Sequence, residues 1–198
     1  MRRKVFDVLV SAGGVLVVAV LVVAGALLMW GYSFTNSSVH NQLSEQQIFF
    51  PTRAQLATAK PNTHITPGML PYLEPYAGQQ LVTGQQAEAY ADHFIAIHLQ
   101  EIGGGLTYSE MSAKALALSP TSSAYAADEA KVQLLFQGTT LRGLLLEAYA
   151  FWTFGQIALW AGIAAFILAG LMLLLVGFGF WHSRKVPVTA EILAPPAA

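Results

Sequence analysis

Two long stretches without a charged residue constrain this chain more than any other feature. No Asp, Glu, Lys or Arg occurs in residues 8–44 or in residues 148–183. Charged residues make up 11% of the 198-residue chain, whereas soluble domains usually carry about 25%. Uncharged apolar stretches of this length are typical of helices that cross a bilayer. We therefore predict an integral membrane protein with two spans.

The first predicted span covers residues 6–30. Its apolar run is long enough to cross a hydrocarbon core of about 30 Å, and three basic residues precede it, as in a secretory signal peptide. Small residues at positions 24–26 resemble a cleavage site, but the apolar run continues beyond them to Trp30. We therefore predict an uncleaved signal anchor.

The second predicted span covers residues 157–181. Trp160 and Trp181 stand near its two ends. Their separation corresponds to about 32 Å along a helix, which matches the distance between the two aromatic belts of a bilayer. Basic residues follow the span immediately.

The basic residues next to the spans predict the orientation. All five lie at the chain ends: Arg2, Arg3, Lys4, Arg184 and Lys185. Because positive residues near spans stay on the cytoplasmic side, residues 1–5 and 182–198 should be cytoplasmic. Residues 31–156 should be extracytoplasmic; they carry five Lys and Arg against nine Asp and Glu, a net charge of −4. The predicted location is a bacterial plasma membrane.

Two capping boxes predict helices within residues 31–156. Thr83 is followed three residues later by Gln86, and Thr107 by Glu110. A Thr with Glu or Gln at this spacing satisfies free backbone N–H groups at a helix start. We expect helices over residues 83–102 and 108–118, the first of them ended by three consecutive glycines.

The remainder of this segment also favours helices. A helix capped by Ser37 or Ser38 should end before Pro51, because the residue before a proline avoids helical geometry. Five of the nine prolines fall in residues 51–75, which predicts a turn-rich connector with short helical pieces at residues 69–76.

A further helix over residues 124–136 should end at Gly138. Thr139 or Thr140 should then cap a last helix that starts at residue 141 and runs without interruption into the second span. No strand-like alternation persists. The predicted fold class is all-α, with two transmembrane helices flanking a helical extracytoplasmic domain.

No strong signature of catalysis or metal binding is present. The chain has no cysteine, which excludes disulfides, cysteine-based zinc sites and covalent haem attachment. His98 and Glu101 share one face of a predicted helix, but His93 is turned about 140° away from His98. The net charge of −1 gives no support for nucleic-acid binding. We therefore expect a non-enzymatic protein without a metal or cofactor.

Small residues in the second span predict close helix packing. Small side chains at spacings of four allow helix backbones to approach each other in a membrane. The residues concerned are Ala158, Ala161, Gly162, Ala165 and Ala169. They predict an interface either with the first span or with another membrane protein.

Four segments carry a resemblance to a known group of proteins. They are RKVFDVLVSAG, QQIFFP, PYLEPYAGQQ and LRGLLLEAYAFW. With them the chain resembles uncharacterised two-span membrane proteins of actinobacteria over most of its length. Such proteins sometimes carry an aromatic ring-opening dioxygenase label, which would imply an iron site. The histidines and carboxylates here do not form the two-His-one-carboxylate set of such a site.

Two hypotheses about function follow. The first is a non-catalytic membrane protein that serves as an accessory or scaffold subunit of a larger complex, with membrane lipids and other integral membrane proteins as partners. The alternative is an extracytoplasmic binding module for an apolar ligand such as a lipid or quinone. Its expected ligand surface includes Tyr149, Phe151 and Trp152.

Overall fold

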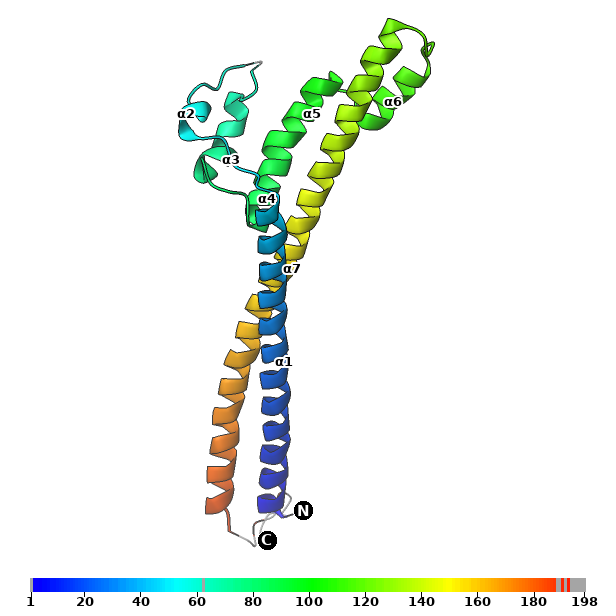
Figure 1. Cartoon of the computed structure of the whole chain (residues 1–198). Coiled ribbons are helices and arrows are strands. Elements are labelled where there is room, and N and C mark those ends of the chain that lie inside the picture. Colours follow the sequence, from blue (N-terminus) through cyan, green and yellow to red (C-terminus); the bar gives the residue numbers. More distant parts are fainter. Residues whose placement is uncertain (1, 62, 188–189, 191, 193–198) are drawn as a thin grey trace. The chain divides into compact units, whose positions relative to one another are not determined.

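The secondary structure is entirely helical in the part of the chain that the structure describes. The computed structural model describes residues 2–61, 63–187, 190 and 192. These residues form helices and turns and contain no strand (Figure 1). The predicted all-α class is confirmed. The helices are, in order, α1 (Arg3–Glu45), α2 (Arg53–Leu56), the 3-10 helix η1 (Pro67–Met69), α3 (Leu70–Leu73), the 3-10 helix η2 (Glu74–Tyr76), α4 (Gly84–Tyr90), the π-helix η3 (Ala91–Ile95), α5 (Ala96–Gly103), α6 (Tyr108–Leu116) and α7 (Ser123–Lys185).

The chain divides into two compact units. Unit 1 combines Met1–Phe34 with Gly155–Ala198, and unit 2 is Thr35–Phe154. The helices α1 and α7 each contribute one part to unit 1 and the other part to unit 2.

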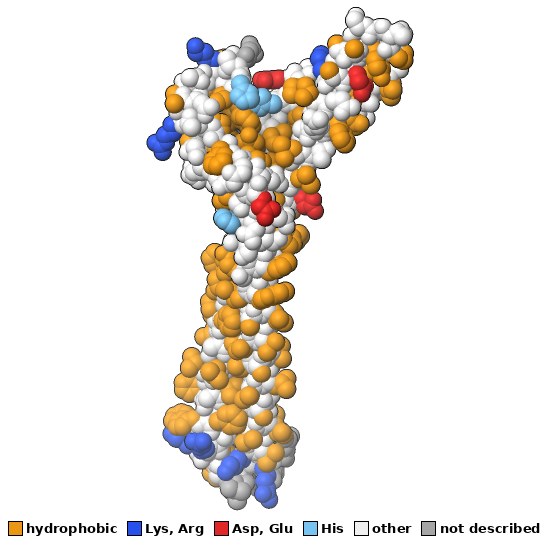
Figure 2. Space-filling model, in the orientation of Figure 1, with side chains coloured by type: hydrophobic (Ala, Val, Ile, Leu, Met, Phe, Trp, Pro, Cys, Tyr) orange, Lys and Arg blue, Asp and Glu red, His pale blue; other side chains and the backbone are white. Residues whose placement is uncertain are grey.

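Unit 1 is a pair of long apolar helices. Both α1 and α7 are long and apolar enough to cross a membrane. Only 17% of the most apolar 18-residue window of each helix is buried, so most of its apolar side chains face outward, unlike those of a core helix in a soluble protein. Figure 2 shows hydrophobic side chains along this pair and Lys and Arg side chains at the end that carries the termini. Lys185 lies 3.8 Å over the ring of Trp181.

The two helices of unit 1 meet along a seam of small residues. Buried positions on α7 recur every seven residues, a spacing that keeps one face toward a partner helix: Gly155, Gly162, Ala169, Val176 and Ser183. On α1, Ser11, Gly14 and Gly25 are buried. A Cβ added at Gly162 would lie 3.3 Å from the carbonyl oxygen of Gly25. The two backbones therefore approach each other closely at this glycine.

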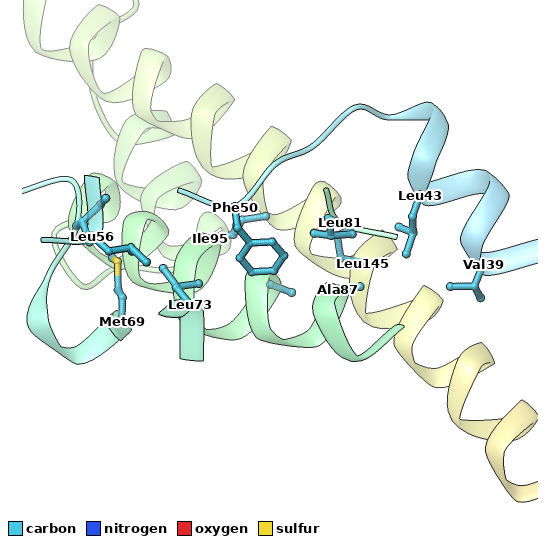
Figure 3. Close-up of a cluster of buried hydrophobic side chains, with 12 residues drawn as sticks. Val39, Leu43, Phe50, Leu56, Met69, Leu73, Leu81, Ala87, Ile95 and Leu145 are labelled. Carbon is cyan, nitrogen blue, oxygen red and sulfur yellow. The ribbon is translucent and has the colours of Figure 1, made fainter. Parts of the chain in front are cut away.

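The core of unit 2 lies where the end of α1 and the middle of α7 meet the short helices. Val39 and Leu43 of α1 and Leu145 of α7 are buried. They belong to one cluster that continues through Phe50, Leu73, Leu81 and Ile95 (Figure 3). A smaller cluster joins α6 to α7 through Met111, Ala115, Val132 and Leu135.

Both predicted capping boxes are confirmed. The Thr83 hydroxyl accepts a hydrogen bond from the backbone N–H of Gln86, and the Gln86 side chain accepts one from the N–H of Thr83. Thr107 and Glu110 make the same reciprocal pair at the start of α6. Gly104 ends α5 in the left-handed conformation, with φ of 60°, which glycine adopts without steric cost.

The predicted break before residue 141 is wrong, because α7 is a single helix of 63 residues. The hydroxyl of Thr140 donates to the carbonyl oxygen of Phe136 inside the helix instead of capping a new one. Gly138 also has a packing role: a Cβ there would lie 2.5 Å from Cδ2 of Leu99. The glycine therefore lets α5 approach α7 and does not stop the helix.

The predicted helix start at Ser37 or Ser38 is also wrong. Both residues lie inside α1, where Ser38 Oγ accepts a hydrogen bond from Gln42 Nε2 on the helix surface. The helix ends at Glu45, and Gln47 takes a positive φ of 54°. The chain then runs extended, so that Phe50 donates its N–H to the carbonyl of Gln79. This brings the Phe50 side chain into the core.

Candidate functional site

A groove near the predicted ligand surface lies in unit 2, between the end of α1 and the middle of α7. It has a volume of about 480 Å³. We call it the α1–α7 groove. Its lining residues are Val39, Gln42, Leu43 and Gln46 of α1, and Leu144, Leu145, Glu147, Ala148, Ala150, Phe151 and Phe154 of α7.

The groove follows from the residues on the two helices. Val39 and Leu43 are four residues apart, so they share one face of α1, and both are buried. Leu145 of α7 is buried with them, 1% exposed. Small Ala148 and Ala150 leave space beside these side chains, while Phe151 and Phe154 remain exposed along the edge. The base of the groove is therefore apolar, and aromatic rings line its edge.

Three polar side chains line the same groove: Gln42, Gln46 and Glu147. Gln42 uses one amide hydrogen to donate to Ser38 Oγ at 3.1 Å. Among the described residues, the carboxylate of Glu147 has neither a hydrogen bond nor an ion pair. The nearest cation along α7, Arg142, is paired with Asp92 at 2.6 Å. The groove therefore has one uncompensated negative charge beside two amide groups.

The three residues of the predicted ligand surface have different environments. Phe151 lines the groove and is 39% exposed. Trp152 instead packs on α4, where a Cβ added at Gly84 would lie 2.6 Å from Trp152 Cγ. Tyr149 stacks on Trp152 with ring centroids 6.2 Å apart. The structure thus places Phe151 in the groove, Trp152 against α4 and Tyr149 against Trp152.

A second cluster gathers histidines and aromatic rings around the π-helix η3. His98 Nδ1 lies 2.6 Å from the carbonyl oxygen of Phe94, and His98 Nε2 lies 2.8 Å from Nδ1 of His64. Since a carbonyl can only accept, His98 carries its proton on Nδ1, and in the neutral pair its Nε2 accepts from His64. His93 points elsewhere and stacks on Tyr72, with ring centroids 3.3 Å apart.

This histidine cluster lacks the ligands of a metal site. Among the described residues, no group of three His, Asp or Glu side chains is placed to hold an ion. The two imidazoles bond each other, and Asp92 is engaged by Arg142. The π-turn supplies the geometry, because one extra residue per turn shifts Phe94 and His98 relative to a regular helix. Its chemical capacity is that of a hydrogen-bonded pair tying residues 63–65 to α5.

Two side chains in unit 2 have pKa values moved from their ordinary range. Burial raises the pKa of Tyr90, whose ring packs on Phe50 and Phe94. The pKa of Glu110 is lowered because its carboxylate accepts a hydrogen bond from the backbone N–H of Thr107 and, with a smaller effect, one from the Thr107 hydroxyl. Both shifts belong to packing and capping rather than to a reactive centre.

The predicted small-residue interface is divided between two environments. Gly162, Ala165 and Ala169 are buried in the seam with α1. Ala161 is exposed and Ala158 is half-buried. Farther along α7, Gly170 and Gly177 are exposed, and no described atom outside the adjacent turns lies within 4 Å of a Cβ added there.

Sequence reasoning missed Gln42, Gln46 and Glu147 as groove residues. Gln42 and Gln46 are four apart and share a face of α1, but nothing in the sequence indicates that this face adjoins α7. Comparison of the chain with protein-family models, with curated proteins and with solved structures gives no significant match. The resemblance to two-span actinobacterial proteins stays a prediction.

Proposed function

We propose that this chain is a non-catalytic integral membrane protein that serves as an accessory or scaffold subunit. Its two apolar helices insert in a bacterial plasma membrane with both termini in the cytoplasm. Unit 2 is held outside and binds its partners from there. The 63-residue α7 supports this role, because one uninterrupted helix contributes to both units.

The observation that carries the proposal is the outer face of α7. A groove of about 330 Å³ is lined by Leu174, Gly177, Phe178 and Trp181. Gly170 lies seven residues before Gly177, on the same face. Glycine is a poor helix former, and its benefit in a membrane is the close approach of another helix. The seam with α1 does not use these two glycines, so a further helix is the natural occupant.

A partner helix at this face can be tested by adding bulk. We expect Gly170→Leu with Gly177→Leu to lower recovery of a membrane partner about tenfold, because overpacking costs about 1–3 kcal/mol. Recovery is measured by affinity purification in mild detergent. Ala164→Leu, an exposed position on a different face of α7, is the matched control. Ala161→Leu tests the predicted alanine stripe separately.

Partner recovery must depend on which face of α7 carries the added leucines. Equal recovery with the double variant and the control would remove this face of α7 from the interface. If the partner recovered is a second copy of the chain, the proposal of a subunit within a larger complex gives way to a homo-oligomer. If the wild type recovers no membrane protein in several detergents, the scaffold role is contradicted.

The proposed orientation makes a separate prediction. The chain has no cysteine, so single cysteines can be labelled without background. Thr121→Cys should react with an impermeant thiol reagent on intact cells, and His182→Cys should react only after lysis. Both parent residues are exposed, whereas Ser183 is 4% exposed and would be protected on either side. The reverse labelling pattern would contradict the orientation.

A further inference from the structure

We propose that the α1–α7 groove binds one zwitterionic phospholipid, with the headgroup ammonium at Glu147 and the phosphate at the amides of Gln42 and Gln46. The inference adds a ligand site to the proposed function and rests on its membrane insertion. Three features of the groove support this site: the side chains along it, the charges of its polar residues, and the surroundings of those charges.

The first feature is the distribution of apolar and polar side chains along the groove. Phe154 directly precedes unit 1, and Val39, Phe151 and Phe154 line the end of the groove nearer to the spans in sequence. The polar residues lie farther from the spans along the chain, Gln42 and Gln46 on α1 and Glu147 on α7, and Leu43, Leu144 and Leu145 line the groove beside them. Glu147 is seven residues from Phe154, or about 10 Å along the helix. Apolar side chains therefore lie on both sides of the polar ones, so a lipid chain can lie along them while its headgroup reaches Glu147, Gln42 and Gln46.

The second feature is the charge of the polar residues, which selects the headgroup. A carboxylate accepts hydrogen bonds and attracts a cation, whereas a glutamine amide donates to phosphate oxygens. Glu147 with Gln42 and Gln46 therefore complements a headgroup that carries both an ammonium and a phosphate. An anionic headgroup without a cation would be repelled by Glu147. A quinone, which has only carbonyl acceptors at its polar ring positions, leaves the carboxylate unsatisfied.

The third feature is that few other groups of the protein bind these three side chains. Among the described residues, Glu147 has no cationic partner: the two ion pairs there join Lys114 to Asp128 and Arg142 to Asp92. Gln46 makes no side-chain hydrogen bond in the same part of the chain, and Gln42 has one amide hydrogen left after its bond to Ser38. The polar residues of the groove therefore offer an acceptor and donors that the protein does not use itself.

The test measures which lipid stays bound to the full chain. Protein in mild detergent is equilibrated with equal amounts of palmitoyl-oleoyl phosphatidylethanolamine and phosphatidylglycerol, and bound lipid is counted by native mass spectrometry. We expect phosphatidylethanolamine to be retained several-fold more. Glu147→Gln should reduce its retention up to about fivefold, the range of a solvent-accessible ion pair, and Glu147→Lys should reverse the preference.

Two further variants separate the groove from general lipid association. Ala150→Trp fills the groove from an exposed position and should abolish retention of both lipids. Glu101→Gln removes an exposed carboxylate that does not line the groove and should change nothing. Equal retention of both lipids by the wild type, or retention that survives Ala150→Trp, would identify annular lipid only and overturn the proposal. Tighter retention of menaquinone-4 in the same assay would overturn it as well.

Failure of the lipid site can be distinguished from failure of the proposed function by a membrane-extraction experiment. A chain that alkaline carbonate releases from membranes is not inserted, which contradicts the proposed function and the lipid site together. A chain that stays in the membrane but shows no headgroup preference contradicts the lipid site alone.

Discussion

Gly84→Ala is expected to destabilise unit 2 more than any other single-methyl change in its helices. The new Cβ would lie 2.6 Å from Cγ of Trp152 and closer still to its Cβ. The Cβ of Trp152 is fixed to the backbone, so a rotamer change cannot move it away. Overpacking of this kind costs about 1–3 kcal/mol, which corresponds to a melting temperature lowered by roughly 5–15 °C for a domain of this size. Thermal unfolding followed by circular dichroism measures the effect.

Two comparisons make this prediction specific. Gly143→Ala adds the same methyl to an exposed position of α7 with nothing within 4 Å, and it should stabilise the helix by about 0.5–1 kcal/mol. Trp152→Ala removes Cγ and the ring but keeps the Cβ, so it should relieve part of the clash. The double variant with Gly84→Ala should therefore be less destabilised than the sum of the two single changes. A melting temperature unchanged by Gly84→Ala would mean that α4 does not pack on Trp152.

The local helix signals in the sequence were reliable where they depend on adjacent residues. Thr83 with Gln86 and Thr107 with Glu110 cap helices as predicted, because a capping box is formed entirely within four residues. The box at Thr52 and Gln55 has the same pattern and begins α2. The all-α class follows from such signals together with the two long apolar stretches.

The signals failed where a distant contact decides the role of a residue. Gly138 and Thr140 resemble a helix stop and a new cap, yet Leu99 of α5 packs at Gly138 and Thr140 bonds backward to Phe136. The sequence does not show which helix will approach a glycine. For the same reason a regular alanine spacing did not reveal that Ala161 is exposed while Ala165 and Ala169 are buried.

The candidate site was predictable only in its general location. The aromatic residues Tyr149, Phe151 and Trp152 indicated an apolar surface on the outer half of the last helix. Which of them lines a groove depends on α4, which takes Trp152 as a packing partner through Gly84. Glu147 and the two glutamines became part of a site only once α1 and α7 were placed side by side within unit 2.

Gly162→Leu is expected to separate α1 from α7 in unit 1. A Cβ at this position would already lie 3.3 Å from the Gly25 carbonyl oxygen and from the Leu28 Cβ. The remaining leucine carbons have to displace the α1 backbone, because it cannot rotate away as a side chain can. Overpacking of about 1–3 kcal/mol is again expected, so the fraction of closely paired helices should fall by roughly tenfold.

A disulfide at the other end of the seam measures this separation. A Cβ at Gly179 lies 3.6 Å from the Ser11 Cβ, within the 3.5–4.5 Å range of disulfides, and the chain has no cysteine of its own. In the variant with Ser11→Cys and Gly179→Cys, mild oxidant should form the crosslink rapidly, and Gly162→Leu should slow its formation roughly tenfold. Gly170→Leu, which adds the same bulk at an exposed glycine, should leave the rate unchanged. Equal rates in both leucine variants would show that the seam tolerates a large side chain, and the distinction between the seam and the outer face of α7 would no longer hold.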